Sequence, residues 1–190
     1  AGAAIAAFNG SVPLTVIAGK QARLAEIALG LSLKSYAFET YRKQDPETPA
    51  PNREVRFEVK DPDAASADYV AFGAQAEGVV FTRDLVSEPA NVLTTSEFAS
   101  RLESLRELGV EVEVLDEPEL ERLGMRTLLA VGQGSASPSK VVVMQWKGGD
   151  AATRPLALVG KGVVFDTGGI SIKPSAGMEE MTMDMGGAAV

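Results

Sequence analysis

The segment Glu54–Leu85, EVRFEVKDPDAASADYVAFGAQAEGVVFTRDL, decides the fold class because its hydrophobic period changes within it. Apolar and charged residues alternate over Glu54–Val59, which is the pattern of a half-buried strand. Asp61 then offers an N-cap, and the residues after it predict a helix that runs to about Leu85. We therefore expect a strand that leads into a long helix, and the length of that helix suits a connection between two domains.

Further strands and helices alternate on both sides of this segment. Strands are predicted at Leu14–Ala18, Val110–Leu115, Val141–Trp146 and Leu156–Val159, and helices at Gln21–Ser35, from Thr95–Ser96 to Gly109, and at Glu117–Leu123. The last two of these strands are so apolar that both are expected to be buried on two faces. Proline-rich Lys43–Asn52 and Gly/Ser-rich Gly132–Ser139 are predicted loops. The alternation predicts an α/β fold with a mixed, largely parallel sheet flanked by helices.

The composition limits the kinds of protein that this chain can be. The net charge of −8, without a cluster of Lys and Arg, argues against nucleic acid as a principal partner. No apolar run reaches the roughly 18 residues that a membrane span needs, and Ala1–Asn9 lacks the pattern of a signal peptide. Cysteine is absent, so no disulfide framework is possible. We therefore expect a cytoplasmic protein with no membrane partner.

Histidine is absent as well, and its absence limits the chemistry. A Ser-His-Asp triad, a Cys-His pair and a zinc site built on His or Cys are all excluded within these residues. A metal ion here must be held by carboxylates, together with backbone oxygens, water or an unusual amine. A general acid or base must be Asp, Glu, Lys or Tyr.

Residues Leu158–Val190, LVGKGVVFDTGGISIKPSAGMEEMTMDMGGAAV, contain the strongest candidate site. Lys161, Asp166, Lys173 and Asp184 lie there among glycines and next to apolar runs. The C-terminal ends of buried parallel strands are where α/β proteins place functional groups, and burying charges without partners is costly. The sequence therefore predicts a metal ion or a mutual network of charges at this place.

Ordinary structural roles also explain these residues when each is taken alone. Asp184 precedes a predicted helix at Gly186–Val190 and is suited to an N-cap, and Asp166 before Thr-Gly-Gly is suited to an Asx-turn. A lysine after a strand is usually a solvated end. The alternating methionines of Met181–Met185 predict an extended chain with Thr182 and Asp184 on one face and the methionines on the other. The functional interpretation rests on the convergence of four charged groups.

Three stretches resemble the leucyl aminopeptidase (cytosol aminopeptidase) family of metallopeptidases. The match is strongest over Val159–Ala189, VGKGVVFDTGGISIKPSAGMEEMTMDMGGAA. Arg83–Ala99, RDLVSEPANVLTTSEFA, resembles the segment that opens the catalytic domain of that family. Leu31–Arg42, LSLKSYAFETYR, is a weaker match to the end of its N-terminal domain. Ser87 stands where Asn is usual and Thr95 where Pro is common, and neither is a metal position.

The resemblance implies how the chain is organised. Residues 1–60 correspond to part of an N-terminal α/β domain, residues 61–85 to a connecting helix, and residues 86–190 to the first half of the catalytic metallopeptidase domain. The chain is then incomplete at both ends.

The resemblance also implies separate roles for the charged residues. Lys161, Asp166 and Asp184 correspond to ligands of a two-metal centre, in which Asp166 bridges both ions. Lys173 corresponds to the catalytic lysine that polarises the scissile carbonyl, and Met181 to a residue that lines the pocket for the first side chain of the substrate. The other ligands of the family, an Asp and a Glu, and its catalytic Arg are expected beyond Val190.

The implied activity is that of a metal-dependent aminopeptidase. Such an enzyme releases N-terminal residues from peptides, with leucine-like residues preferred, by means of a water molecule activated by two divalent ions. Carboxylate ligands suit Mn²⁺ and Mg²⁺ and also accept Zn²⁺. The family is typically hexameric, so a homo-oligomer is expected. The 190-residue chain alone is expected to be inactive because half of the metal ligands are missing.

Two other classes of function stay open at this point. One is a non-catalytic or DNA-binding regulatory protein on the same fold, although the acidic composition argues against it. The other is a protein that binds phosphate or a nucleotide through its glycine loops. Gly132 and Gly134 lack the third glycine of a dinucleotide fingerprint, and Gly160–Lys161–Gly162 lacks the Ser or Thr of a P-loop.

Overall fold

The computed structural model describes residues 13–19, 23–43 and 54–190. The chain divides into two compact units, Ala1–Asp84 and Leu85–Val190, which we call the N-terminal unit and the C-terminal unit. No helix in these described ranges is both long and apolar enough to cross a membrane.

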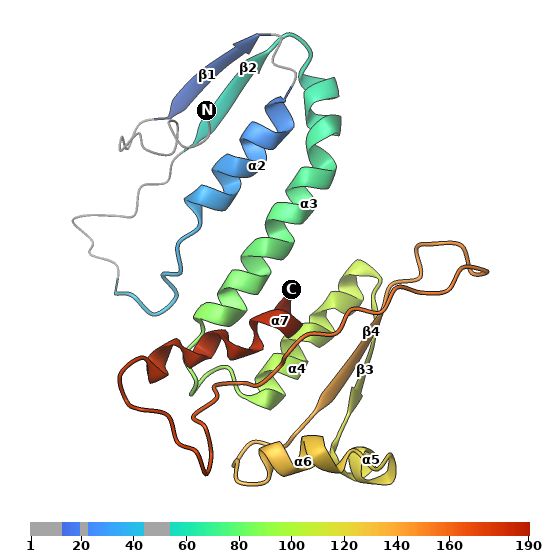
Figure 1. Ribbon diagram of the computed structural model, residues 1–190. Coiled ribbons are helices and arrows are strands. Elements are labelled where there is room, and N and C mark those ends of the chain that lie inside the picture. The colour runs from blue at the N-terminus through green and yellow to red at the C-terminus, as the bar shows by residue number, and fades with distance from the viewer. Residues whose placement is uncertain (1–12, 20–22, 44–53) are drawn as a thin grey trace. The chain divides into compact units, whose positions relative to one another are not determined.

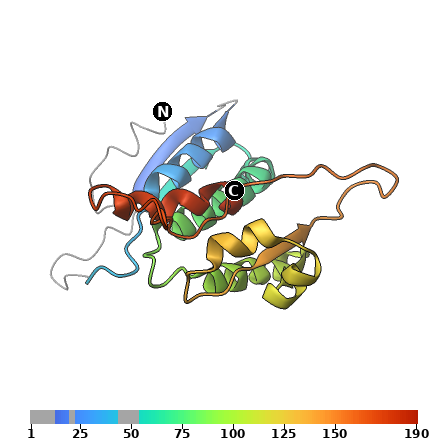
Figure 2. The same ribbon diagram turned by 60° about the horizontal axis from the view of Figure 1, so that its bottom comes forward.

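In the N-terminal unit, two helices lie on one side of a parallel pair of strands (Figures 1 and 2). The strands are β1 (Leu14–Gly19) and β2 (Val55–Val59), and the helices are α2 (Leu24–Ser35) and α3 (Pro62–Ser87). The odd-numbered residues of β2 face α2 and α3 across an apolar groove, and the charged residues between them are exposed. The predicted strands, the helix that ends at Ser35 and the long helix are therefore confirmed. Of the predicted loop at residues 43–52, all but Lys43 lies outside the described residues.

Asp61 caps α3 as the sequence predicts, because its Oδ1 accepts a hydrogen bond of 3.1 Å from the backbone N–H of Ala64.

Side-chain hydrogen bonds fix α2 and α3 against each other. The hydroxyls of Ser32 and Tyr69 lie 2.9 Å apart. Near the other end of α3, Arg83 Nη1 donates to the backbone oxygen of Leu33 at 2.6 Å.

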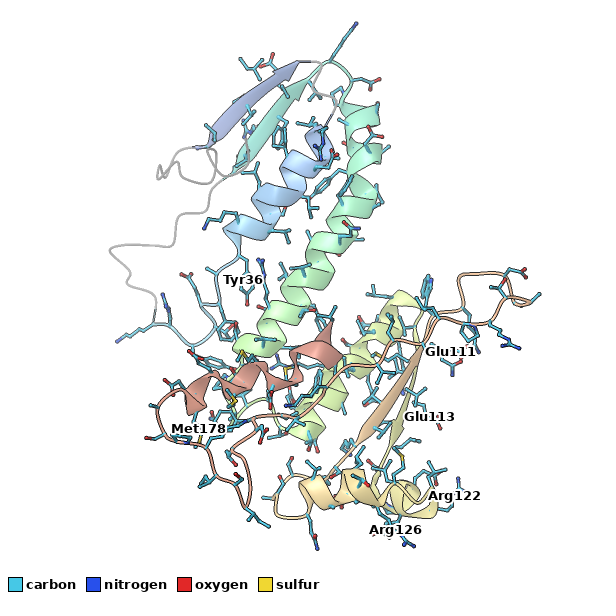
Figure 3. All side chains as sticks on the ribbon, in the orientation of Figure 1. Tyr36, Glu111, Glu113, Arg122, Arg126 and Met178 are labelled. Carbon is cyan, nitrogen blue, oxygen red and sulfur yellow. The ribbon has the colours of Figure 1, made fainter. Side chains whose placement is uncertain are left out.

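The C-terminal unit contains the rest of the described elements. These are α4 (Thr95–Glu103), the 3₁₀ helix η1 (Ser104–Leu108), β3 (Glu111–Leu115), α5 (Glu117–Arg122), α6 (Arg126–Gly132), β4 (Val141–Gln145), the 3₁₀ helix η2 (Met178–Met185) and α7 (Gly186–Ala189). β3 and β4 pair antiparallel, so one described pair is parallel and the other antiparallel, as expected of a mixed α/β fold. Glu111 and Glu113 extend from the solvent side of β3, while Val112 between them is buried (Figure 3).

The helix cap predicted at Thr95–Ser96 lies one residue earlier. Thr94 Oγ1 accepts a hydrogen bond of 3.2 Å from the N–H of Glu97, which makes Thr94 the N-cap of α4. Thr95 instead donates its hydroxyl proton to the backbone oxygen of Pro138 at 2.7 Å. The predicted end of this helical region is confirmed, because Gly109 has a φ of 88° and ends η1.

The strand predicted at residues 156–159 is wrong. These residues form no described strand, and Leu156, Leu158 and Val159 are 86%, 87% and 97% exposed. A strand needs a neighbour for its backbone N–H and C=O groups, and no described strand pairs with this segment. The segment after β4 projects from the rest of its unit (Figures 1 and 2). β4 is half-buried to exposed, so the expected burial on two faces is also wrong.

The extended chain predicted over Met181–Met185 is wrong as well. Gly177, with a φ of 81°, is the N-cap of the helix η2, and the buried and half-buried residues Met178, Met181 and Met185 follow a helical spacing. Met185 is fully buried, Met181 is half-buried and Met183 is exposed. The helix predicted after Gly186 is confirmed as α7. The start of the predicted loop at 132–139 belongs to α6.

Candidate functional site

The candidate site is built from turns and from η2 rather than from a regular strand. Residues 154–163 form no helix or strand, and we call them the extended segment. Lys161 follows Gly160 in this segment, and the backbone oxygen of Lys161 accepts a hydrogen bond of 2.9 Å from the N–H of Ala188 in α7. A second turn is closed by the N–H of Lys173, which donates to Thr167 O at 2.9 Å. The first hydrogen bond joins the segment of Lys161 to α7, and the second closes the local turn between Thr167 and Lys173.

The structure brings all four predicted charged residues together. Lys161 Nζ lies 2.7 Å from Asp184 Oδ2 and 4.0 Å from Asp166 Oδ2. Lys173 Nζ lies 3.0 Å from Asp166 Oδ2 and 4.0 Å from Asp184 Oδ2. Each amine therefore faces both carboxylates, and the functional prediction of a shared cluster agrees with this geometry.

The surroundings of Asp166 stabilise its ionised form. Lys173 lowers the pKa of Asp166, and so does the N–H of Gly168, which donates to Asp166 Oδ1 at 2.8 Å. The hydrogen bond from Gly168 forms the Asx-turn that the sequence predicts. Asp166 therefore stabilises a turn and also belongs to the charged cluster. Phe165 before it has a φ of 54°, a rare conformation for an aromatic residue. Nothing in the sequence predicts this backbone conformation directly before Asp166.

Asp184 Oδ2 is the atom of the cluster that can most readily accept a further contact. This oxygen is buried from solvent and accepts no hydrogen bond with suitable geometry from the described residues. Lys161 Nζ is near enough for an ion pair at 2.7 Å, so we interpret this contact as an ion pair without a directed hydrogen bond. The same contact raises the pKa of Lys161. A carboxylate oxygen has two lone pairs, so Asp184 Oδ2 can accept a further contact in addition to this ion pair.

The residues present fit a divalent metal ion in part. Two carboxylates that share one small space are suitable ligands for Mn²⁺, Mg²⁺ or Zn²⁺, and the unsatisfied Asp184 Oδ2 is available to such an ion. Within the described residues, however, no group of three or more His, Cys, Asp or Glu side chains is arranged to hold a metal ion. The described residues therefore provide two acidic ligands and two amines.

Met181 lies directly beside the lysine of the cluster. Its Sδ is 3.1 Å from Lys173 Nζ, and its side chain is half-buried. Met181 comes from η2, whose first residue, Met178, is labelled in Figure 3. A role for Met181 in binding a substrate side chain stays a prediction.

One glycine in each of the two glycine loops packs against another part of the chain. A Cβ on Gly160 would lie 2.0 Å from the backbone oxygen of Gly187, and a Cβ on Gly132 would lie 2.1 Å from Ser139 Oγ. Gly134, in the same loop as Gly132, has no atom within 4 Å of an added Cβ. The phosphate-binding alternative stays a prediction.

Comparison with known proteins defines the class to which this fold and site belong. The catalytic domain of the cytosol aminopeptidase family matches residues 80–190. The chain is 55% identical over 190 residues to a probable cytosol aminopeptidase of Cereibacter sphaeroides, and 54% identical over 190 residues to that of Dinoroseobacter shibae. Both matches cover all of this chain and 38% of the relative. The chain belongs to the cytosol aminopeptidase family.

Two solved structures are similar as well. The cytosol aminopeptidase of Coxiella burnetii is 30% identical with a TM-score of 0.73, over 87% of this chain and 34% of that protein. The bottromycin maturation enzyme BotP, in complex with Mn, is 36% identical with a TM-score of 0.70, over 88% of this chain and 34% of that protein.

Proposed function

We propose that this chain belongs to a metal-dependent aminopeptidase that releases N-terminal residues, leucine-like ones preferentially, from peptides. Membership of the cytosol aminopeptidase family supports the class of reaction. The observation that carries the metal dependence is Asp184 Oδ2, a buried acceptor without a directed hydrogen bond in a cluster of two carboxylates and two amines.

Lys161, Asp166 and Asp184 are the residues proposed to hold two divalent ions. When bound, two such ions would polarise the peptide carbonyl and lower the pKa of a water molecule toward ~7. Mn²⁺ and Zn²⁺ are the proposed ions, with Mg²⁺ as a third candidate. Lys161 must lose its proton before it can act as a ligand, and its contact with Asp184 opposes that loss by raising its pKa.

Lys173 is the proposed catalytic residue. Its ammonium donates to the backbone oxygen of Asp166 at 2.9 Å, so its position does not depend on carboxylates alone. A fixed positive charge next to the scissile carbonyl would stabilise the negative charge that develops on the carbonyl oxygen. Met181, in contact with the same amine, is proposed to line the pocket for the first side chain of the substrate.

The wider setting of this activity is also a proposal. The curated relatives are much longer than this chain, since it spans 38% of their length. We propose that the whole protein works in the cytoplasm as a homo-oligomer, a hexamer by resemblance to its family, with peptides as substrates. The remaining metal ligands and a catalytic arginine are proposed to follow Val190.

The test uses the full-length protein, stripped of metal with a chelator and assayed with leucine amide. We expect hydrolysis to be lost on stripping and restored by Mn²⁺ or Zn²⁺. Acetyl-leucine amide, whose α-amine is blocked, is the matched control and is expected not to be cleaved. Equal hydrolysis of the free and the blocked substrate, or hydrolysis that does not respond to metal, would contradict the proposal.

A further inference from the structure

The backbone of the extended segment touches the backbone of α7 without any side chain between them. A Cβ added to Gly160 would lie 2.0 Å from the oxygen of Gly187, 2.3 Å from its carbonyl carbon and 2.7 Å from the nitrogen of Ala188. All three are backbone atoms of α7, so no side-chain rotation can make room. Gly160 is not among the glycines with positive φ. The position therefore needs glycine for space and not for conformational freedom.

Gly187 in α7 and Gly162 in the extended segment are also closely packed at this contact. A Cβ on Gly187 would lie 3.1 Å from the nitrogen of Lys161, and a Cβ on Gly162 would lie 3.3 Å from the Cβ of Ala188. The hydrogen bond from Ala188 N–H to Lys161 O, 2.9 Å long, joins the two segments at this point. Gly160 is thus the most restricted position of a continuous backbone contact.

This contact lies between two of the charged residues of the site. Lys161 follows Gly160 directly, and Asp184 lies three residues before Gly187 in η2, which leads into α7. A shift of α7 away from Gly160 would therefore lengthen the 2.7 Å separation of Lys161 Nζ and Asp184 Oδ2. Asp166 and Lys173 are joined by contacts within their own turn, so their separation does not depend on this packing.

We infer that Gly160 and Gly187 are positioning residues, whose bare backbones set the separation between Lys161 and Asp184 and so shape one half of the metal site. The inference rests on the proposed function for its meaning, since it assumes that these two side chains bind the metal. The separation itself is a property of the metal-free protein and can be measured without a metal.

The test compares four variants of the full-length protein in order of the predicted clash: Gly160→Ala, Gly187→Ala, Gly162→Ala and, as the control, Gly134→Ala. Gly134 has no atom within 4 Å of an added Cβ and is not among the glycines with positive φ. Gly187→Ala has a smaller clash, so it remains a test if Gly160→Ala does not fold.

Two readouts separate positioning from stability. The first is the Kd for Mn²⁺ by calorimetric titration, and we expect Gly160→Ala to raise it by about tenfold or more, a loss like that seen when groups that orient metal ligands are removed. The second is the ratio of acetylation at Lys161 to that at Lys173 in metal-free protein, measured by peptide mass spectrometry. Loss of the Lys161–Asp184 ion pair is expected to raise this ratio by about two- to fivefold.

The outcomes are distinguishable. A raised Kd and a raised ratio in Gly160→Ala and Gly187→Ala, with Gly134→Ala like the wild type, would support the inference. If the wild type binds Mn²⁺ and both glycine variants match Gly134→Ala in both readouts, the inference is wrong and the proposed function stands. If the wild type binds no metal, the proposed function fails, and the acetylation ratio alone decides whether the glycines set the separation.

Discussion

Lys161 and Lys173 face the same two carboxylates, yet they are held in different ways. Lys173 has two further contacts, with the backbone oxygen of Asp166 and with Met181 Sδ, and its side chain is 33% exposed. Lys161 Nζ contacts carboxylate oxygens alone within the described residues, and its side chain is 54% exposed. The amine with additional anchors suits a group that is held in place, and the amine without them is freer to move.

The first prediction concerns Lys173. In the full-length protein, Lys173→Ala should lower kcat by about 10²–10³, the usual loss when a group that stabilises an oxyanion is removed. Its metal content should stay close to that of the wild type, since this lysine is not a proposed ligand. The measurements are steady-state kinetics with leucine amide and metal analysis of the same sample.

Lys147→Ala is the matched control, because Lys147 is an exposed lysine that pairs with Glu111 on the surface. If Lys173→Ala loses metal but keeps normal activity per bound metal, Lys173 is a metal ligand and not the catalytic residue.

The second prediction concerns Asp184. Asp184→Asn keeps the shape of the side chain but removes the charge that an ion would meet at Oδ2. We expect the Kd for Mn²⁺ to rise by at least about 100-fold, above the range typical of residues that only support a ligand. A titration of the full-length protein, followed by the spectroscopic signal of free Mn²⁺, measures the change. An unchanged Kd would remove Asp184 from the ligand set; Asp150→Asn, on an exposed loop, is the control.

At the scale of elements, the spacing of hydrophobic residues predicted an element correctly where that element has a packing partner among the described residues. The alternation of Val55, Phe57 and Val59 predicted β2, which has a described partner in β1, and Gly109 predicted the end of η1. The segment at 156–159 was mispredicted because a strand depends on a partner that its own residues do not specify. The methionines of η2 were mispredicted because Met181, Met183 and Met185 alternate in the sequence, whereas the helix buries Met185 and exposes Met183.

The charged site was predicted better than the elements that carry it. Lys161, Asp166, Lys173 and Asp184 do meet, although one predicted strand is absent and the last of the four lies on a 3₁₀ helix. The residue types were visible in the sequence. The contact of Gly160 with Gly187 was not, because packing between two backbones leaves no trace in hydrophobic period.

The third prediction tests the corrected helix start. Thr94→Ala should lower the free energy of unfolding by about 1 kcal/mol, since it leaves the N–H of Glu97 without its cap. Urea denaturation of the full-length protein measures it. Thr153→Ala, at an exposed loop position, is the control and should change the free energy by less than about 0.5 kcal/mol. A loss no larger than that of the control would argue against Thr94 as the N-cap.

At the scale of the whole molecule, the described residues supply only two acidic ligands for a proposed two-metal centre. The fourth prediction is that the purified 190-residue chain does not hydrolyse leucine amide in the presence of Mn²⁺, whereas the full-length protein does. Light scattering of the full-length protein should give the mass of a hexamer. Measurable turnover by the 190-residue chain would show that its own residues complete the active site.

The most direct test of the central claim is a crystal structure of the full-length protein soaked in Mn²⁺, with the ions located by anomalous scattering. The account predicts two anomalous peaks at the cluster, with Asp166 between them and with Lys161 Nζ and Asp184 Oδ2 bonded to manganese instead of to each other. Manganese bound elsewhere, with Lys161 and Asp184 still paired at about their present separation of 2.7 Å, would contradict it.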